Sequence, residues 1–488
     1  MANGGDVTLE RGAVGFPTAL ATTVGLIIAS SVLLSATVGY GAGGYVFAIA
    51  VVIAYVLMIA QSASFAEGSA ILPTAGSVYD YIASGMGRFF AITGTLAAYL
   101  LVDVFAGSAE AAAAGIFARA NFGDLENFSL TGNWWIGVGL VVILALVNAL
   151  GIRVYGSVEI GLTIAMWGTL VLFSLVGIFS AKQTSITGFF GDPVFPVNLE
   201  NILSMVALAL FLYVGMEYVV PLAAEVREPA RTIPRAMYIG VTAVGFAMFI
   251  YGAAIARQVE NEVLDPDTGE AILDTPIAIP LFAEEIFGTF GRYWLGIAVL
   301  FAAAATLNTV LASIPRILYG MAKDGTVPSV FGYLHPRFRE PWVGIALVGL
   351  LPILGTLYID LVRDGDVASI IQLILAAVGA WIFSYVLINI SIVALRARRP
   401  DIDRPYKTPL YPLPQILATI GLVIAFWYIA PPGLTRSDIY IPFGIMLGAS
   451  AIYALIWTYF VQKQNPWKPE EPETFLAEEG MAEAPEGM

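Results

Sequence analysis

Acidic side chains occur inside two of the most apolar stretches of this chain. Asp103 and Glu110 belong to the apolar run 89–117, and Glu217 belongs to the run 202–223. An acid at the centre of a membrane helix costs roughly 2.5–3.5 kcal/mol on insertion scales, so it normally faces the protein interior and a partner. Two tasks would repay that cost: binding a cationic group, or carrying a proton. The alternative is a structural acid hydrogen-bonded to neighbouring helices.

Asp103 and Glu110 share one face of their predicted helix. Together with Tyr99 and Ala106 they follow the spacing i, i+4, i+7, i+11, which places all four side chains on one side of an α-helix. Asp103 lies near the centre of the run and Glu110 nearer its outer end. Asp103 is therefore a candidate for substrate binding. Asp103, Glu110 and Glu217 are the candidates for proton or ion coupling.

The apolar run 202–223 is interrupted at about mid-membrane depth by Gly215, Glu217 and Pro221. Hydrocarbon offers no water to a broken backbone, so such a break survives only where protein or a watery cavity covers it. Secondary transporters build their substrate sites from interrupted helices of this kind. For Glu217 three roles stay open: a substrate ligand, a proton ligand, or a brace for the unwound segment.

A second breakable segment lies in the first apolar run, 14–36, where Ala29, Ser30 and Ser31 follow one another near the middle. Serine hydroxyls compete for backbone hydrogen bonds and ease a break in a helix. The alternative interpretation is a set of small residues at a helix–helix contact. The two breakable segments occupy corresponding positions in the two halves of the chain, which is typical of a transporter site.

Composition places the chain in the membrane. Of its 488 residues 58% are hydrophobic and only 12% charged, with a mean hydropathy of +0.81, whereas soluble domains carry about 25% charged residues. There is no cysteine and one histidine, His335, in a predicted loop. These counts exclude a disulfide framework, a thiolate or histidine metal site and a Ser-His-Asp hydrolase. The net charge of −14 argues against nucleic acid as a partner.

Twelve apolar runs have about the length of a membrane-spanning helix, near 17–25 residues. They are roughly 14–36, 43–65, 89–117, 134–150, 156–179, 202–223, 237–256, 293–320, 342–359, 368–395, 413–430 and 441–462; the fourth and ninth are marginal. Most of the 23 Lys and Arg residues fall on the side of the predicted bundle that holds the N-terminus. We therefore expect a multi-pass protein of the cell membrane with both termini in the cytoplasm.

Several motifs resemble those of the amino acid–polyamine–organocation (APC) transporters. The sixth run and its loop give an aromatic, Gly and Glu, then E-x-x-x-P-x-R-x-I-P-R, here Tyr213, Gly215, Glu217, Glu225, Pro229, Arg231, Ile233, Pro234 and Arg235. Further similar stretches begin at Ser64, Asn148, Arg316 and Pro405. The resemblance implies an all-α membrane protein of 12 transmembrane helices, with a LeuT-like 5+5 inverted repeat followed by two C-terminal helices.

The resemblance also divides the chain. Residues 1–13 are expected to form the cytoplasmic N-terminus, 14–395 the inverted-repeat transport core, 396–462 helices 11 and 12 with the loop before them, and 463–488 an acidic cytoplasmic tail. Residues 469–488 hold seven glutamates and no basic residue, so we expect a disordered tail. Glu67, at the inner end of the second run, is expected to tether cytoplasmic loops rather than contact substrate.

In the APC family the unwound first helix holds the substrate carboxylate with backbone N–H groups, and carbonyls of the sixth helix take the amino group. An aromatic residue there closes over the substrate. The candidate substrate-binding residues carried over are Ile28, Ala29, Ser30, Ser31, Asp103, Phe211, Tyr213, Val214 and Gly215. Many bacterial proton-coupled members have a lysine in helix five, where this chain has Met166. The coupling ion, H⁺ or Na⁺, is therefore open, and an exchanger or uniporter is the alternative.

The resulting hypothesis is a secondary amino acid transporter that works by alternating access, with a preference for cationic amino acids because of Asp103. A neutral amino acid or polyamine carrier or exchanger is the alternative within the same class. A sensor or channel with the transporter fold is the alternative from another class. We expect no enzyme activity and no cofactor; the partners are a small amino acid or amine and the lipid bilayer.

Overall fold

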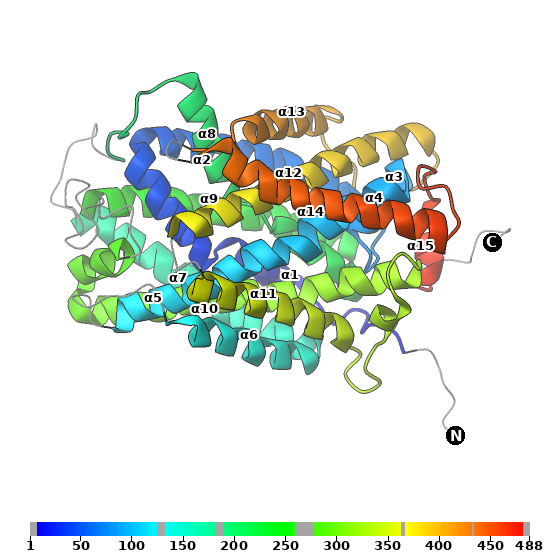
Figure 1. Ribbon diagram of the computed structural model, residues 1–488, viewed down its shortest axis with the longest axis horizontal. Coiled ribbons are helices and arrows are strands. Elements are labelled where there is room, and N and C mark those ends of the chain that lie inside the picture. The colour runs from blue at the N-terminus through cyan, green and yellow to red at the C-terminus, as the bar shows by residue number, and fades with distance from the viewer. Residues whose placement is uncertain are drawn as a thin grey trace.

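The computed structural model is a bundle of helices that lie lengthwise beside one another (Figure 1). It describes residues 7–123, 132–180, 190–258, 277–362, 367–431 and 434–481, and the side chains of all of these except 367–369. Within those ranges the secondary structure is helical apart from one isolated bridge between Val14 and Val226. The described ends of the chain lie at the same end of the bundle, which we call the terminus-bearing end (right in Figure 1).

The α-helices of the first half are α1 (Phe16–Ile27), α2 (Ser30–Ile71), α3 (Val78–Met86), α4 (Arg88–Thr95), α5 (Ser108–Phe122), α6 (Trp134–Ala149), α7 (Ile152–Ser180) and α8 (Leu199–Phe211). Those of the second half are α9 (Pro229–Gln258), α10 (Ala278–Lys323), α11 (Trp342–Val362), α12 (Val367–Arg398), α13 (Leu413–Trp427), α14 (Arg436–Ile456) and α15 (Pro472–Glu478). Short π-helical turns η1 (Leu96–Leu101), η2 (Asp103–Gly107) and η6 (Trp457–Val461), and 3-10 segments η3 (Met216–Glu225) and η5 (Ser329–Gly332), complete the order.

The helices match the expected multi-pass architecture. In the described part of the chain nine helical segments are long and apolar enough to cross a membrane, and α1, α6 and α13 are shorter apolar helices. Every predicted apolar run coincides with one helix or with consecutive helical segments, including the two marginal runs, which are α6 and α11. The all-helical membrane class is confirmed. Twelve crossings, the inverted repeat and the cytoplasmic side of the termini stay predictions.

The predicted break in the first helix is confirmed. α1 ends at Ile27, and α2 begins at Ser30. Between them Ile28 has φ −87° and ψ 74°, and Ala29 has φ −84° and ψ 161°, so neither residue is helical. The chain unwinds here without a glycine, because both backbone conformations have negative φ and suit any L-residue.

The predicted break in the sixth helix is also confirmed. α8 ends at Phe211, and after a turn the chain continues as the 3-10 segment η3, which contains Pro221. Gly215, just before η3, has φ +104°, a left-handed conformation that favours glycine. A Cβ at this position would lie 1.7 Å from Cδ2 of Leu26. The two interrupted helices therefore touch each other at their breaks.

The third apolar run departs from regular α-helix where its acids lie. Between α4 and α5 the chain forms the π-helical turns η1 and η2, and η2 begins at Asp103. π-Helical turns inside α-helices occur frequently at functional sites. A Cβ on Gly107 would lie 2.2 Å from Oδ1 of Asp103, so the glycine gives that carboxylate its room.

The terminus-bearing end is closed by polar contacts between distant segments. Val14 N donates to Glu225 O at 3.0 Å, and Arg227 N donates to Val14 O at 2.9 Å. Arg316 of α10 is buried between Glu225 and Glu340, contacting Glu340 at 2.9 Å. Removing one partner of such a buried pair is strongly destabilising, so these contacts hold α10, η3 and the loop before α11 together.

The expected disorder of the acidic tail is wrong for the part that the structure describes. Residues 472–478 form α15, and Phe475 is buried, with its ring centroid 6.1 Å from that of Tyr79. Arg88 pairs with Glu470 at 2.5 Å, and Arg399 pairs with Glu473 at 2.7 Å. The expected disorder rested on the number of glutamates, which are usually solvated. In the structure Arg88 and Arg399 bind two of them. Residues 482–488 lie outside the described ranges.

Glu67 has the tethering role expected of it. It is fully buried near the end of α2 and accepts hydrogen bonds from Arg396 Nε at 2.6 Å and from Thr408 Oγ1 at 2.7 Å. It thereby joins α2 to the end of α12 and to the loop that follows.

Candidate functional site

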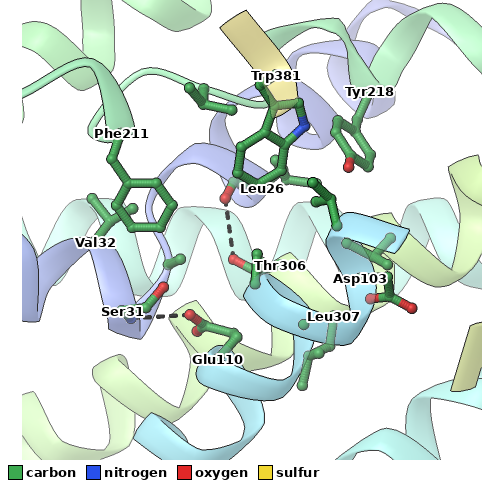
Figure 2. Close-up of a pocket in the computed structure, with 16 residues that line it drawn as sticks. Leu26, Ser31, Val32, Asp103, Glu110, Phe211, Tyr218, Thr306, Leu307 and Trp381 are labelled. Atoms are coloured by element: carbon green, nitrogen blue, oxygen red, sulfur yellow. Dashed lines mark hydrogen bonds between the residues drawn. The ribbon is translucent and has the colours of Figure 1, made fainter. Parts of the chain in front are cut away.

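A cavity lies where the two broken helices meet (Figure 2). Its walls come from the break between α1 and α2, from η2 and α5, from the break after α8, and from α10 and α12. The lining residues are Leu26, Ala29, Ser31, Val32, Val102, Asp103, Ala106, Gly107, Glu110, Phe211, Val214, Tyr218, Thr306, Leu307, Val310 and Trp381. This lining contains two carboxylates and no Lys, Arg or His. The cavity volume is about 40 Å³, room for about three waters at roughly 10–15 Å³ each.

Asp103 is a buried carboxylate without a protein partner. The residue is 2% exposed, and neither carboxylate oxygen has a hydrogen-bond partner among the described residues. Figure 2 shows its side chain at the edge of the cavity, with no dashed contact drawn to it. Buried polar atoms are nearly always hydrogen-bonded, so the two unpartnered oxygens keep Asp103 a candidate for contact with a ligand or ion.

Glu110 is buried as well, but both oxygens of its carboxylate accept hydrogen bonds. Oε1 accepts a hydrogen bond from Ser30 N at 2.7 Å, and Oε2 accepts one from Ser31 N at 2.9 Å (Figure 2 draws the second). These are the first two amides of α2, which no side chain of the preceding residues caps. Helix N-terminal amides have no partner within the helix, and the helix dipole favours an anion there.

The other side of the same break is satisfied by α10. Thr306 Oγ1 lies 3.2 Å from both Gly25 O and Leu26 O, two carbonyls in the last turn of α1. The Thr306 hydroxyl therefore bonds to backbone, while its side chain also lines the cavity. The unwound backbone is therefore supported by a carboxylate on one side and a hydroxyl on the other, as a break inside a membrane requires.

The structure gathers most of the candidate residues at the cavity and places others behind it. Ala29, Ser31, Asp103, Phe211, Val214 and Glu110 line the cavity, whereas Ile28, Ser30, Tyr213 and Gly215 do not. The Phe211 ring lies in the cavity wall, its centroid 6.5 Å from that of Trp381. The Tyr213 hydroxyl instead donates to Val51 O at 3.1 Å. Of the two aromatic residues beside the break, Phe211 is therefore the one that lines the cavity.

Glu217 braces the unwound segment. Its Oε2 accepts from the Tyr385 hydroxyl at 2.8 Å, and its Oε1 lies 3.4 Å from the Tyr99 hydroxyl. The Tyr385 oxygen is also 3.5 Å from Gly215 N. Glu217 is fully buried and does not line the cavity. Among the three roles left open by the sequence, this geometry favours the brace.

Helix α7 presents an acid, and not a base, to the broken first helix. Met166 is buried and carries no charge. About two turns earlier, Glu159 accepts from Asn308 Nδ2 at 2.8 Å, and a Cβ on Gly25 would lie 2.0 Å from its Oε1. Glu159 is not among the candidates predicted from the sequence, although it is a lone acid in the run 156–179 and an acid within an apolar run is the signal that indicated Asp103.

Trp381 is a lining residue that the sequence analysis missed. It contributes to the wall from α12, far along the chain from every candidate residue. It lies within an apolar run without a neighbouring charge or break. No sequence signal separates such a tryptophan from an ordinary packing residue.

Comparisons with known proteins agree with this architecture. The sequence profile of the family described as "Amino acid permease" matches residues 14–451. The chain is 25% identical over 413 residues to the serine/threonine exchanger SteT of Bacillus subtilis, covering 84% of this chain and 89% of that protein.

Two further relatives carry different substrates in their names. One is "Cationic amino acid transporter 4, vacuolar" of Arabidopsis thaliana, 27% identical over 402 residues, which cover 78% of this chain and 63% of that longer protein. The other is the branched-chain amino acid permease BcaP of Bacillus subtilis, 22% identical over 441 residues, covering 86% and 88% of the two chains. These relatives are transporters and not enzymes. The chain belongs to the amino acid permease family of the APC superfamily.

Proposed function

We propose that this permease is a secondary transporter that works by alternating access and prefers cationic amino acids. The preference rests on Asp103. Its two buried oxygens have no hydrogen-bond partner among the described residues, and the cavity that it lines has no basic side chain. A ligand ammonium or guanidinium placed against this carboxylate would supply the missing hydrogen-bond donors. The buried charge would then be paired, which repays the cost of placing it there.

Contacts at the two ends of the bundle support alternating access. At the terminus-bearing end, the Arg316 contacts and the Val14–Val226 pairing join α10, η3 and the segment before α1. At the opposite end, the segment after residue 190 pairs with the kink of α2, with Tyr45 N donating to Gly191 O at 3.0 Å and Val194 N donating to Ala42 O at 2.9 Å. Contacts between segments at both ends of the bundle fit a carrier that breaks one set of contacts at a time.

Asp103 is also the coupling residue that we propose. Glu110 and Glu217, the other two candidates, already accept hydrogen bonds from backbone or hydroxyl groups. A carboxylate without a partner can take up H⁺ or Na⁺ when no cationic ligand is present. Asp103 then serves both in ion coupling and in substrate recognition, because the ion and the cationic group of the ligand bind the same oxygens in turn.

The names of the relatives include three different substrate classes. The proposed substrate of this chain therefore rests on the residues that line its own cavity. They describe a serine/threonine exchanger, a cationic amino acid transporter and a branched-chain permease. Asp103 favours the cationic class, while Phe211 and Trp381 would pack on the apolar stem of a long side chain. Neutral amino acids would leave Asp103 unpaired.

The test compares the binding of arginine and leucine to purified protein with and without the charge at position 103. Asp103→Asn should weaken arginine by roughly 30-fold or more, since truncating one partner of a buried charge pair costs about 2–5 kcal/mol. Leucine should change by less than about threefold. Equal losses for both ligands would remove Asp103 from recognition. Binding that persists without movement across a membrane would indicate a sensor instead of a carrier.

A further inference from the structure

We propose that Glu110 is an internal stand-in for the substrate carboxylate, which a carboxylate-bearing substrate must displace in order to bind. The inference rests on the proposed function, because it concerns the same cavity and assumes an amino acid ligand. It assigns to Glu110 a role in specificity that is distinct from ion coupling and from recognition of a cation.

The geometry of Glu110 is that of a bound anion. Each of its two oxygens accepts one hydrogen bond, from Ser30 N and Ser31 N, the first two amides of a 42-residue helix. The carboxylate comes from α5, 80 residues further along the chain. Ala29, in the capping position, has no side-chain acceptor of its own to offer. A ligand carboxylate at this helix end would take the same two amides, with the same bidentate geometry.

An unpartnered carboxylate in the same cavity points independently to a ligand. Asp103 is buried and lines the cavity, and neither of its oxygens has a hydrogen-bond partner among the described residues. Buried polar groups are nearly always satisfied in proteins. The unpaired carboxylate on η2 therefore fits a polar ligand that extends through the cavity from Asp103 toward the amides that Glu110 occupies.

The charges in the cavity make displacement necessary. With Glu110 and Asp103 the lining holds two carboxylates and no basic residue. A substrate carboxylate would add a third negative group and would find the α2 amides already taken. It can bind only where Glu110 gives way, whereas the corresponding amine without a carboxylate requires no displacement. Glu110 should therefore penalise amino acids relative to their decarboxylated amines.

A permanent helix cap is the alternative role for Glu110. A cap contributes to folding, and its loss would weaken all ligands together. A displaceable occupant has the opposite effect on one class of ligand: its removal frees two amides, and the carboxylate-bearing ligand gains them. The ratio of the affinities for an amino acid and its amine separates the two roles, because a general loss of fold cancels in that ratio.

The experiment measures dissociation constants by calorimetry for two matched pairs, arginine with agmatine and leucine with isoamylamine. The proteins are wild type, Glu110→Ala, Glu110→Gln and a control, Asp360→Ala. Asp360 is a matched control because it is a buried carboxylate that also accepts from two successive amides, Gly132 N at 3.0 Å and Asn133 N at 3.2 Å. It does not line the cavity.

In Glu110→Ala the affinity ratio of amino acid to amine should rise at least tenfold over wild type, and Asp360→Ala should leave the ratio unchanged. Glu110→Gln should shift it in the same direction by less, because the glutamine carbonyl still accepts from one amide. This variant preserves the test where the alanine protein does not fold.

A ratio within twofold of wild type in the folded Glu110 variants would overturn the proposal. So would a selective loss of the amino acid, which would make Glu110 a direct ligand. Wild-type protein that binds neither arginine nor leucine would overturn the proposed function, and this inference with it.

Discussion

Leu26 and Gly215 contact each other at the point where the two interrupted helices meet. Gly215 has φ +104°, and a Cβ there would lie 1.7 Å from Cδ2 of Leu26. The glycine therefore serves two purposes: it permits the left-handed turn that starts η3, and it admits the last turn of α1 against the backbone. Both breaks, and the cavity between them, depend on this close approach.

Gly215→Ala should lower the thermal stability of the purified protein more than a strained backbone alone would. Gly191→Ala is the matched control, because Gly191 also has positive φ, +73°, but a Cβ there would meet nothing within 4 Å. The loss of stability in Gly191→Ala measures the cost of an unfavourable φ alone, about 1–3 kcal/mol. A larger loss at position 215 measures the contact with Leu26. Equal losses in the two variants would mean that the helices do not meet there.

Tyr385→Phe should weaken the unwound segment without changing selectivity. The substitution removes the hydroxyl that donates to Glu217 at 2.8 Å. A hydrogen bond to a charged group contributes about 1.5–3 kcal/mol, so melting should occur at lower temperature. The ratio of arginine to leucine affinity should stay as in wild type. A change in that ratio would place Glu217 at the ligand and contradict its role as a brace.

Glu67→Ala should destabilise the protein and leave ligand binding intact. Glu67 is fully buried and pairs with Arg396 and Arg404, so removing it takes the carboxylate away from two mostly buried guanidinium groups. Breaking such a pair costs about 3–5 kcal/mol when both groups are buried, and less here because Arg396 is partly exposed. Thermal unfolding and calorimetric binding on the same preparation would check this. Lost affinity in a protein of normal stability would contradict the tethering role.

The docked tail should loosen at alkaline pH. Burial, together with the negative charge of Asp324, raises the pKa of Glu478 from 4.5 to about 8. The docked tail therefore favours the protonated acid. Its contribution is complete below about pH 4.5 and is lost as the pH rises through about 8. Wild-type protein should be cleaved faster within residues 466–481 at pH 9 than at pH 7.

The control for this prediction is Glu478→Gln, which has no charge to gain at that position. Comparing the two proteins at each pH cancels the pH dependence of the protease itself. The tail of the variant should be equally protected at both values. An identical pH response in the two proteins would assign the effect to another group.

The sequence predicted those features that a local residue type determines. Gly215 and Pro221 cannot continue an α-helix unchanged, so the break after α8 was visible in the run of residues. Asp103 stood out because a charge in an apolar run needs a special environment. Both depend on one residue and its immediate neighbours, and both are confirmed as structural features.

The rest of the site depends on contacts between segments far apart in the chain. Glu110 and Ser30 are separated by 80 positions, and nothing in either run indicates that the carboxylate caps α2. The π-helical turn at Asp103 changes which residues of that helix share a face, so Tyr99 reaches Glu217 while Asp103 and Glu110 line the cavity. The docking of the acidic tail was missed for the same reason, since its basic partners lie on other helices.

Uptake into liposomes that contain the purified wild-type protein tests the central claim most directly. Labelled arginine and labelled leucine would be compared at equal concentration, with unlabelled ligand trapped inside to drive exchange and with Asp103→Asn as the second protein. The account predicts arginine uptake well above that of leucine, and loss of this difference in Asp103→Asn. Leucine uptake equal to or above that of arginine in wild type would contradict a cation site at Asp103.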